Sequence, residues 1–222
     1  MMESMPPSQP LDPRKTALLL IDLQNGTCGS DPKPQRQAFD PIFRQRTLPA
    51  LQLALRQARC AGLEVIHTVI ENLTSNGRDR SLDYKRCGLG FPPGSMEARV
   101  IEELAPAPDE LVLPKSSSSP FSSTPLDYLL RNMGIRTLIV AGILTDQCID
   151  HTVKDAADRG YRVLCLTDAC MAETPERHHR ALECFRGYAE QIPVAELDGL
   201  LHRSLSAAAE DRRCHELEHE EI

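Results

Sequence analysis

The sequence lacks a hydrophobic stretch that could cross a membrane, and it lacks an excess of basic residues. No run approaches the roughly 18 consecutive apolar residues that a transmembrane helix requires. The chain of 222 residues carries a formal net charge of -7, whereas a surface that binds phosphate groups needs a basic excess. These absences argue against a membrane protein and against a nucleic-acid partner, and they favour a protein that acts on a soluble small molecule.

The N-terminal segment also lacks the pattern of a secretory signal peptide. It reads MMESMPPSQPLDPRK, with an acidic residue and prolines where a signal peptide has basic residues followed by a long apolar segment. The eight cysteines are scattered without close pairs, and a chain of this length can form a core without disulfide bonds. We therefore expect reduced thiols and a cytoplasmic protein.

Recurring apolar runs, nearly continuous rather than alternating, predict strands that are covered on both faces. The expected strands cover residues 16–22, 63–70, 110–113, 135–142 and 161–169, with a short last strand at 192–197. Helical spacing predicts helices over residues 47–62, 124–134, 146–160 and 175–191. This alternation predicts right-handed βαβ units, and hence a three-layer α/β/α fold with a Rossmann-like, mostly parallel six-stranded sheet.

One domain is expected, over residues 14–203, because the length suits a single α/β unit better than two small ones. Residues 1–13 are expected to form a flexible tail and the polar residues 204–222 an exposed extension. Inside the domain, residues 71–95 carry turn residues and charges with little periodicity. Loops of that length in compact domains are usually functional or disordered, so we expect a binding loop here.

Three candidate chemical residues fall at the carboxyl ends of predicted strands. Asp22 closes the first strand, Lys115 follows the third, and Cys148 follows the fourth. Ligands of open α/β sheets bind at that edge, so the three side chains could share one crevice. Each also has a simpler interpretation: Asp22 as a turn or capping residue, Lys115 as a solvated loop residue, and Cys148 as a small buried residue.

Cys148 differs from other cysteines in its predicted position. Cys165 lies inside a strand, and Cys60 and Cys184 fall on apolar faces of predicted helices, where cysteine packs as a small hydrophobic residue. Cys148 lies near a helix N-terminus, where the helix dipole and free backbone N–H groups favour a thiolate. We therefore expect a lowered thiol pKa at position 148.

The three candidates together suit hydrolysis of a C–N bond. A thiolate at Cys148 would attack a carbonyl carbon, while Asp22 accepts the thiol proton and later returns it to the leaving amine. Lys115 would hold the carboxylate and the thiolate in place, and backbone N–H groups of residues 143–148 would bind the oxyanion. These residues predict a cysteine amidohydrolase that needs no cofactor.

Two segments resemble the isochorismatase-like cysteine hydrolases. They are DLQN at residues 22–25 and LPKSSSSPFSSTPLDYLLRNMGIRTLIVAGILTDQCIDHTVKDAADRGYRVLCLTDAC at residues 113–170. The resemblance spans roughly residues 14–197. Members of this family are often homo-oligomers, so the resemblance implies one here.

The resemblance also implies roles for individual residues. Asp22, Lys115 and Cys148 would form the Asp-Lys-Cys triad of the family. A non-proline cis peptide would join Ile143 to Leu144, and the amides of Leu144 and Cys148 would form the oxyanion hole.

Substrate-binding candidates come from the first motif and from the charged loop: Gln24, Glu71, Arg80, Tyr84 and Lys85. An arginine can hold a carboxylate by a bidentate fork. The segment GRDRSLDYK, residues 77–85, is similar to family members that act on ureido compounds such as biuret. A solvated charged loop is the alternative interpretation of the same residues.

The branches of the family differ at residues that this sequence displays. Members that cleave the vinyl ether of isochorismate typically lack the cysteine, and nicotinamidases usually carry an Asp-x-His metal motif after the second strand. Here Cys148 is present and the second region reads HTVIENLTSNGRD, without that motif. The resemblance thus favours C–N hydrolysis of a small amide or ureido substrate. An isochorismatase that releases pyruvate and a catalytically silent binding protein remain the alternatives.

A zinc-protease pattern, HELEH at residues 215–219, lies near the end of the sequence. Its flanks are polar and no third ligand follows, whereas a catalytic zinc needs three protein ligands in a packed site. We expect no metal at this motif. His178 and His179 are expected on a helix surface rather than as ligands.

Overall fold

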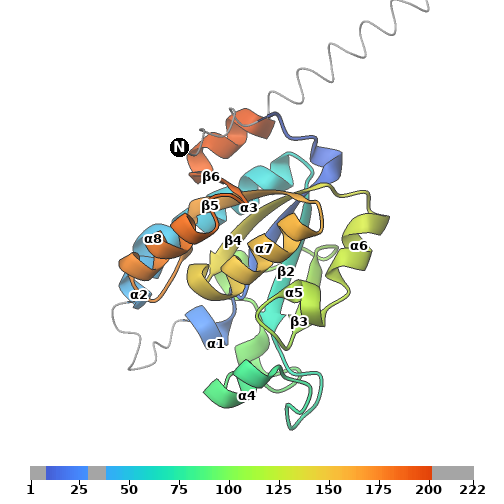
Figure 1. Ribbon diagram of the computed structural model, residues 1–222, viewed down its shortest axis with the longest axis vertical. Helices are drawn as coiled ribbons and strands as arrows, with labels where there is room; N and C mark the ends of the chain where they lie inside the picture. Colours follow the sequence, from blue (N-terminus) through green and yellow to red (C-terminus); the bar gives the residue numbers. More distant parts are fainter. Residues whose placement is uncertain (1–8, 30–38, 202–222) are drawn as a thin grey trace, which may run out of the picture.

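Six parallel strands form the central sheet of the computed structural model, which describes residues 9–29 and 39–201 (Figure 1). The strands are β1 (Thr16–Ile21), β2 (Glu64–Ile70), β3 (Leu111–Lys115), β4 (Thr137–Ile143), β5 (Arg162–Met171) and β6 (Glu190–Ile192). Their spatial order is β3-β2-β1-β4-β5-β6, and all neighbours are parallel. The predicted α/β fold with a mostly parallel six-stranded sheet is confirmed.

Helices cover both faces of the sheet, with α7 in front of it and α3 behind it in Figure 1. The α-helices are α1 (Asn25–Cys28), α2 (Phe39–Ile42), α3 (Leu48–Cys60), α4 (Leu82–Cys87), α5 (Pro120–Ser123), α6 (Leu126–Asn132), α7 (Asp150–Asp158) and α8 (Pro175–Cys184). Shorter 3-10 or π turns are η1 (Pro13–Lys15), η3 (Phe43–Thr47), η4 (Met96–Ala98), η5 (Glu102–Leu104) and η6 (Thr145–Ile149). Residues 194–201 are also helical.

Alternate residues of β1 enter two hydrophobic cores, one on each face of the sheet. Leu18 and Leu20 pack in the core that includes α3 and residues 194–201. Leu19 and Ile21 pack in the core that includes α6 and α7. All six residues of β1 are buried, which explains why its apolar run is continuous rather than alternating.

The ends of β1 and β4 approach each other closely. Ile21 pairs with Gly142, whose φ is 128°. A Cβ atom at position 142 would collide with the carbonyl oxygen of Ile21, and residues with a side chain rarely adopt such a conformation. Glycine therefore allows the segments that follow these two strands to lie side by side.

The last elements of the chain differ from the predicted ones. α8 ends at Cys184 rather than at residue 191, and residues 194–201 are helical where a strand was expected at 192–197. The last strand is instead β6, which pairs with the edge of β5. Phe185, directly after α8, is fully buried. Tertiary pairing and burial thus override the helical pattern of these residues.

Cysteines in the described part of the chain are free thiols, as expected: Cys28, Cys60, Cys87, Cys148, Cys165, Cys170 and Cys184. Cys165 is buried in β5, in agreement with its predicted position, but Cys60 and Cys184 are exposed. The expectation that these two pack on apolar helix faces is wrong. Each is the last residue of its helix, beyond the turns that pack on the core.

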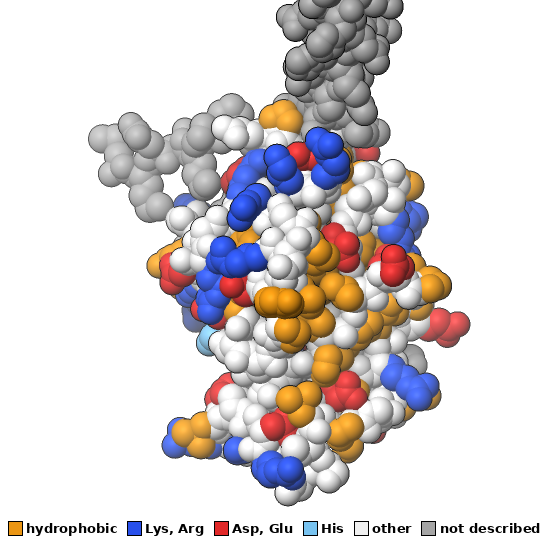
Figure 2. Space-filling model, turned by 90° about the vertical axis from the view of Figure 1, so that its right-hand side faces the viewer, with side chains coloured by type: hydrophobic (Ala, Val, Ile, Leu, Met, Phe, Trp, Pro, Cys, Tyr) orange, Lys and Arg blue, Asp and Glu red, His pale blue; other side chains and the backbone are white. Residues whose placement is uncertain are grey.

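One side of the molecule, where β3 and α6 lie, is shown in Figure 2, and hydrophobic side chains gather near the centre of that face. The large exposed apolar residues here are Val112 of β3, Tyr128 of α6 and Met133, which directly follows α6. The homo-oligomer that the resemblance implies stays a prediction.

Some expectations fall outside the described residues. They include the HELEH motif at 215–219, the extension at 204–222 and the first eight residues of the expected tail. Among the helices that the structure describes, none combines the length and the apolar character needed to span a membrane.

Candidate active site

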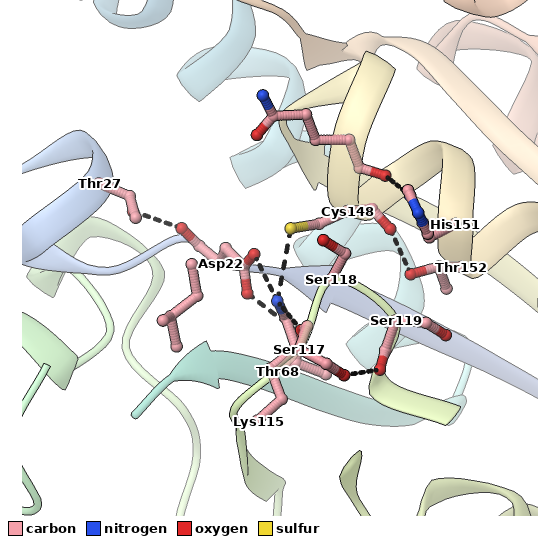
Figure 3. Close-up of polar contacts among 12 residues, drawn as sticks. Asp22, Thr27, Thr68, Lys115, Ser117, Ser118, Ser119, Cys148, His151 and Thr152 are labelled. Atoms are coloured by element: carbon pink, nitrogen blue, oxygen red, sulfur yellow. Dashed lines mark hydrogen bonds and ion pairs between the residues drawn. The ribbon is translucent and has the colours of Figure 1, made fainter. Parts of the chain in front are cut away.

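Three side chains from the carboxyl ends of three strands meet at one point of the sheet edge (Figure 3). Asp22 follows β1, Lys115 is the last residue of β3, and Cys148 lies in η6, directly after β4. β1 and β4 are neighbours at the centre of the sheet, whereas β2 separates β1 from β3. The long lysine side chain therefore reaches across the end of β2. This is the edge at which open α/β sheets bind ligands.

The three groups contact one another in the protein interior. The Lys115 ammonium lies 3.0 Å from Asp22 Oδ2 and 3.4 Å from Cys148 Sγ, and the Cys148 thiol hydrogen-bonds the Asp22 carboxylate. All three side chains are almost fully buried. Buried charges are stable only when they are paired and hydrogen-bonded, so this cluster is held together as a unit.

Asp22 is positioned by backbone contacts on both sides. Its N–H donates to Thr68 O at 2.9 Å, and its carbonyl accepts from Thr27 Oγ1 at 2.5 Å. Its φ of 58° lies in the left-handed region, which aspartate tolerates better than most residues. Burial raises the pKa of the Asp22 carboxyl, against the opposing effects of the Lys115 charge and the Cys148 thiol. A carboxylate with a raised pKa is a better proton acceptor.

Lys115 stays charged although its side chain is fully buried. Burial disfavours the ammonium, but the charge of Asp22 outweighs it and raises the pKa of Lys115. The ammonium also donates to Ser117 O at 3.0 Å and to the Tyr84 hydroxyl at 2.9 Å. Lys115 is thus a fixed positive charge between the carboxylate and the thiol.

The pKa of the Cys148 thiol is raised, whereas the sequence predicts a lowered pKa. Burial, and next the charge of Asp22, raise its pKa to about 12, although Lys115 and a hydrogen bond with Tyr84 act in the other direction. Cys148 does lie near the start of a helical segment. Desolvation outweighs the helix dipole, whose effect is small and falls off within one turn. The thiol must therefore lose its proton as it reacts.

The segment before Cys148 has the conformation that the resemblance implies, because the peptide bond from Ile143 to Leu144 is cis. The N–H groups of Gln147 and Ile149 both donate to Leu144 O, at 3.0 and 3.2 Å. These bonds fold residues 144–149 into the tight π turn η6. The oxyanion hole formed by the Leu144 and Cys148 amides stays a prediction.

The first turn of α8 holds this nucleophile segment from outside. His178 Nδ1 lies 2.8 Å from Thr145 Oγ1, and Arg177 donates to Asp146 Oδ2 at 2.5 Å. The expectation that His178 lies on a helix surface is wrong, because its side chain is buried, whereas His179 is exposed as expected. Burial, together with the charges of nearby basic groups, lowers the pKa of His178 to about 4.

Of the predicted substrate-binding residues, Tyr84 is the one whose side chain hydrogen-bonds triad side chains in the described residues, whereas Glu71 donates its backbone N–H to Lys115 O at 3.1 Å. Gln24 is buried and bonds Ile70 and the Glu97 carbonyl, so it joins β1 to β2 and η4. Arg80 donates to the Gly77 and Leu89 carbonyls within its own loop. Glu71 accepts from the Gly94 N–H, and Lys85 is exposed on α4.

Residues that the sequence did not single out also contact the triad. Thr68 Oγ1 donates to Asp22 Oδ1 at 3.5 Å, and the Ser117 carbonyl accepts from Lys115. His67 and Thr68 are polar residues in an otherwise apolar strand. This interruption is the feature of the sequence that could have marked Thr68 as a site residue. Ser117 acts through its backbone, which residue type does not reveal. Within the described residues, no group of three or more His, Cys, Asp or Glu side chains is arranged to hold a metal ion.

Comparison with known families decides the classification of this chain. Residues 16–196 match the model of the isochorismatase domain, which is most of the 222 residues. The chain belongs to the isochorismatase family. The triad residues and η6 all lie inside the matched range.

Three solved structures are similar to this fold. A cysteine hydrolase from Pseudomonas syringae pv. phaseolicola matches 91% of the chain and 100% of its own length, with 24% identity and a TM-score of 0.78. An isochorismatase family protein from Desulfovibrio vulgaris matches 85% of the chain and 99% of its own, with 30% identity and a TM-score of 0.71. An N-carbamoylsarcosine amidase from Thermoplasma acidophilum matches 81% of the chain and 96% of its own length, with 26% identity and a TM-score of 0.66.

Proposed function

We propose that this isochorismatase-family protein is a cysteine hydrolase that cleaves the C–N bond of a small polar amide or ureide through a thioester. The observation that carries the proposal is the contact of one buried ammonium, Lys115, with both the Asp22 carboxylate and the Cys148 sulfur. A nucleophile, a base hydrogen-bonded to it and a group that orients both are the parts that nucleophilic catalysis requires.

The first half-reaction starts from the protonated thiol. The Cys148 proton moves to Asp22 as sulfur attacks the carbonyl carbon, and the C–S bond forms while the carbonyl electron pair moves to oxygen. Asp22 then gives this proton to the leaving nitrogen as the C–N bond breaks. The raised pKa of the Asp22 carboxyl suits both steps, because a group must be able to accept and release a proton near neutral pH. Lys115 keeps its proton throughout.

The second half-reaction releases the acyl group to water. Asp22 takes a proton from the water molecule as its oxygen attacks the thioester carbon, the C–S bond breaks, and the sulfur recovers the proton. The developing oxyanion in both halves would be held by backbone N–H groups at Leu144 and Cys148. Such donors contribute strongly because they are fixed before the reaction begins.

The substrate class rests on one similarity and on the burial of the triad. A protein with 26% identity over most of the chain is an N-carbamoylsarcosine amidase, so N-carbamoyl amino acids are the first compounds to test. The buried triad suits a small substrate. Simple amides and other ureides complete the panel.

The test is a screen of these compounds for ammonia release, with the wild type and Cys148→Ala compared. Turnover should fall by a factor on the order of 10⁴ or more in the variant, because the nucleophile is gone. Cys60→Ala is the matched control, since Cys60 is an exposed thiol far along the chain from the site. Full activity of Cys148→Ala on a compound that the wild type hydrolyses would refute the nucleophile assignment.

A second candidate function is hydrolysis of the vinyl ether of isochorismate. The raised pKa of Asp22 favours it, because a raised pKa makes the carboxylate easier to protonate and the protonated group can act as an acid. In that case Cys148 would be a bystander. Pyruvate release from isochorismate that persists in Cys148→Ala supports this candidate, and absence of pyruvate rejects it.

A further inference from the structure

The hydroxyl group of Tyr84 lies between the Lys115 ammonium and the Cys148 sulfur. It is 2.9 Å from Lys115 Nζ and 3.5 Å from Cys148 Sγ. Tyr84 comes from α4, inside the irregular loop that the sequence predicts as a binding loop, and its side chain is 3% exposed. A buried hydroxyl in this position contacts a reacting atom of the proposed hydrolase.

The hydrogen atoms of Lys115 are shared among more neighbours than there are hydrogens. An ammonium group has three hydrogens, and Lys115 donates to Tyr84 OH at 2.9 Å, to Ser117 O at 3.0 Å and to Cys148 Sγ at 3.4 Å. Asp22 Oδ2, at 3.0 Å, is a fourth neighbour. The contact of Lys115 with the sulfur is the longest of the four, so the sulfur is only weakly supplied by the lysine.

Tyr84 can supply a second hydrogen bond to the sulfur. Its oxygen accepts from Lys115, so its own O–H is directed to another acceptor, and the Cys148 sulfur is the acceptor recorded within reach. The thiol hydrogen of Cys148 is donated to Asp22, which leaves the sulfur lone pairs open to the phenol. A hydroxyl that accepts from a cation is polarised and becomes a stronger donor.

We propose that Tyr84 is a catalytic residue that donates a hydrogen bond to the Cys148 sulfur while the thiol loses its proton to Asp22. This inference rests on the proposed function of the same site. The S–H bond breaks, the proton passes to the carboxylate, and the sulfur electron pair forms the new C–S bond. Tyr84 keeps its proton, since burial raises the pKa of its phenol.

This role differs from the substrate-binding role that the sequence suggests for Tyr84. A residue that only binds substrate leaves the free thiol unchanged, whereas a donor to sulfur changes its acidity before any substrate arrives. The reactivity of the Cys148 thiol in the substrate-free protein separates the two roles. This measurement does not require the natural substrate to be known.

The experiment measures alkylation of Cys148 by iodoacetamide at pH 8, with each cysteine peptide quantified by mass spectrometry. The rate constant for Cys148 should fall about tenfold in Tyr84→Phe, because a hydrogen bond to a charged group changes an equilibrium by at least that factor. Tyr128→Phe, at a tyrosine that is 70% exposed on α6, should leave the rate unchanged. Thermal unfolding followed by circular dichroism checks that both variants fold.

A second substitution acts in the opposite direction. Replacement of Tyr84 by 3,5-difluorotyrosine keeps the ring and the hydroxyl but makes the phenol more acidic, so alkylation of Cys148 should become faster. An unchanged or faster rate in Tyr84→Phe overturns the inference, and so does an unchanged rate with difluorotyrosine. Neither result depends on turnover, so failure of the proposed hydrolase reaction remains distinguishable from failure of this role.

Discussion

Cys148 and Cys165 are both buried cysteines on the same core of the protein, yet their surroundings differ in kind. Cys165 lies in the middle of β5 with the Cys170 sulfur 3.8 Å away, and that thiol together with burial raises its pKa. Burial raises the pKa of Cys148 as well. Around Cys148, however, lie an ammonium, a carboxylate and a phenol.

The difference shows that burial does not separate a structural cysteine from a reactive one. A nucleophile in a dry site needs a base to take its proton and donors to hold the charge that develops. Cys148 has both, whereas the contact recorded for Cys165 is another thiol. Substitutions at the charged site and in the packed core should therefore have different consequences.

The largest effect on stability is expected at Lys115. Replacing it by methionine leaves the buried Asp22 carboxylate without its cation, and breaking a buried ion pair costs about 3–5 kcal/mol. The double variant Asp22→Asn/Lys115→Met should recover most of this loss, because no unpaired charge remains. Urea denaturation measures the free energy of unfolding in each protein.

Lys154→Met is the matched control for this prediction. Lys154 pairs with Asp150 one helical turn away, and its side chain is 37% exposed, so its removal should cost no more than about 1 kcal/mol. An equal loss of stability in Lys115→Met and Lys154→Met would contradict the view that Lys115 is the central charge of a buried site.

An effect of intermediate size is expected from the contact between α8 and the nucleophile segment. The folded-state pKa of His178 is about 4, below its ordinary value of 6.5. Between these two pH values the imidazole therefore binds a proton in the unfolded chain but not in the folded protein. Stability is then fully present above about pH 6.5 and decreases as the pH falls toward 4, by about 3 kcal/mol. Denaturation midpoints across this range measure it.

Two neighbouring variants isolate the His178 contribution. His178→Gln should flatten the stability profile between pH 4 and 6.5, because the titrating group is gone, while His179→Gln, at an exposed site, should keep the wild-type slope. Arg46, His179 and Asp146 also face His178 and act on its pKa. A wild-type slope in His178→Gln would assign the pH dependence to other groups.

The smallest effect is expected at Cys165. Cys165→Ala removes one buried sulfur atom from a packed core, which should cost about 1–2 kcal/mol of unfolding free energy. The rate of alkylation of Cys148 at pH 8 should not change, since Cys165 makes no recorded contact with the triad in the described residues. A several-fold change in that rate would show that the two cysteines are coupled.

The fold could be predicted because its signals are local. Continuous apolar runs such as 16–22 match strands buried on both faces, and strand ends then place Asp22, Lys115 and Cys148 on one edge. The prediction failed where pairing decides the structure. Glu190 and Gln191 continue a helical pattern in the sequence, but they form β6 because they pair with the edge of β5.

The chemistry of the site could be predicted only in part. Residue types at strand ends indicated a nucleophile, a base and a cation, but the thiol pKa depends on desolvation, which no spacing reveals. His178 and Tyr84 reach the site through tertiary contacts with residues 33 and 64 positions away along the chain. Neither position carries a periodic or motif signal that marks it as buried.

The most direct test of the account is to trap the intermediate. Wild-type protein should be quenched with acid during turnover of a substrate found in the amide and ureide screen, then digested and analysed by mass spectrometry. The account predicts an acyl group on the peptide that contains Cys148 and on no other cysteine peptide, and none in Cys148→Ala. Turnover without any acyl group on Cys148, at the same rate in Cys148→Ala, would contradict it.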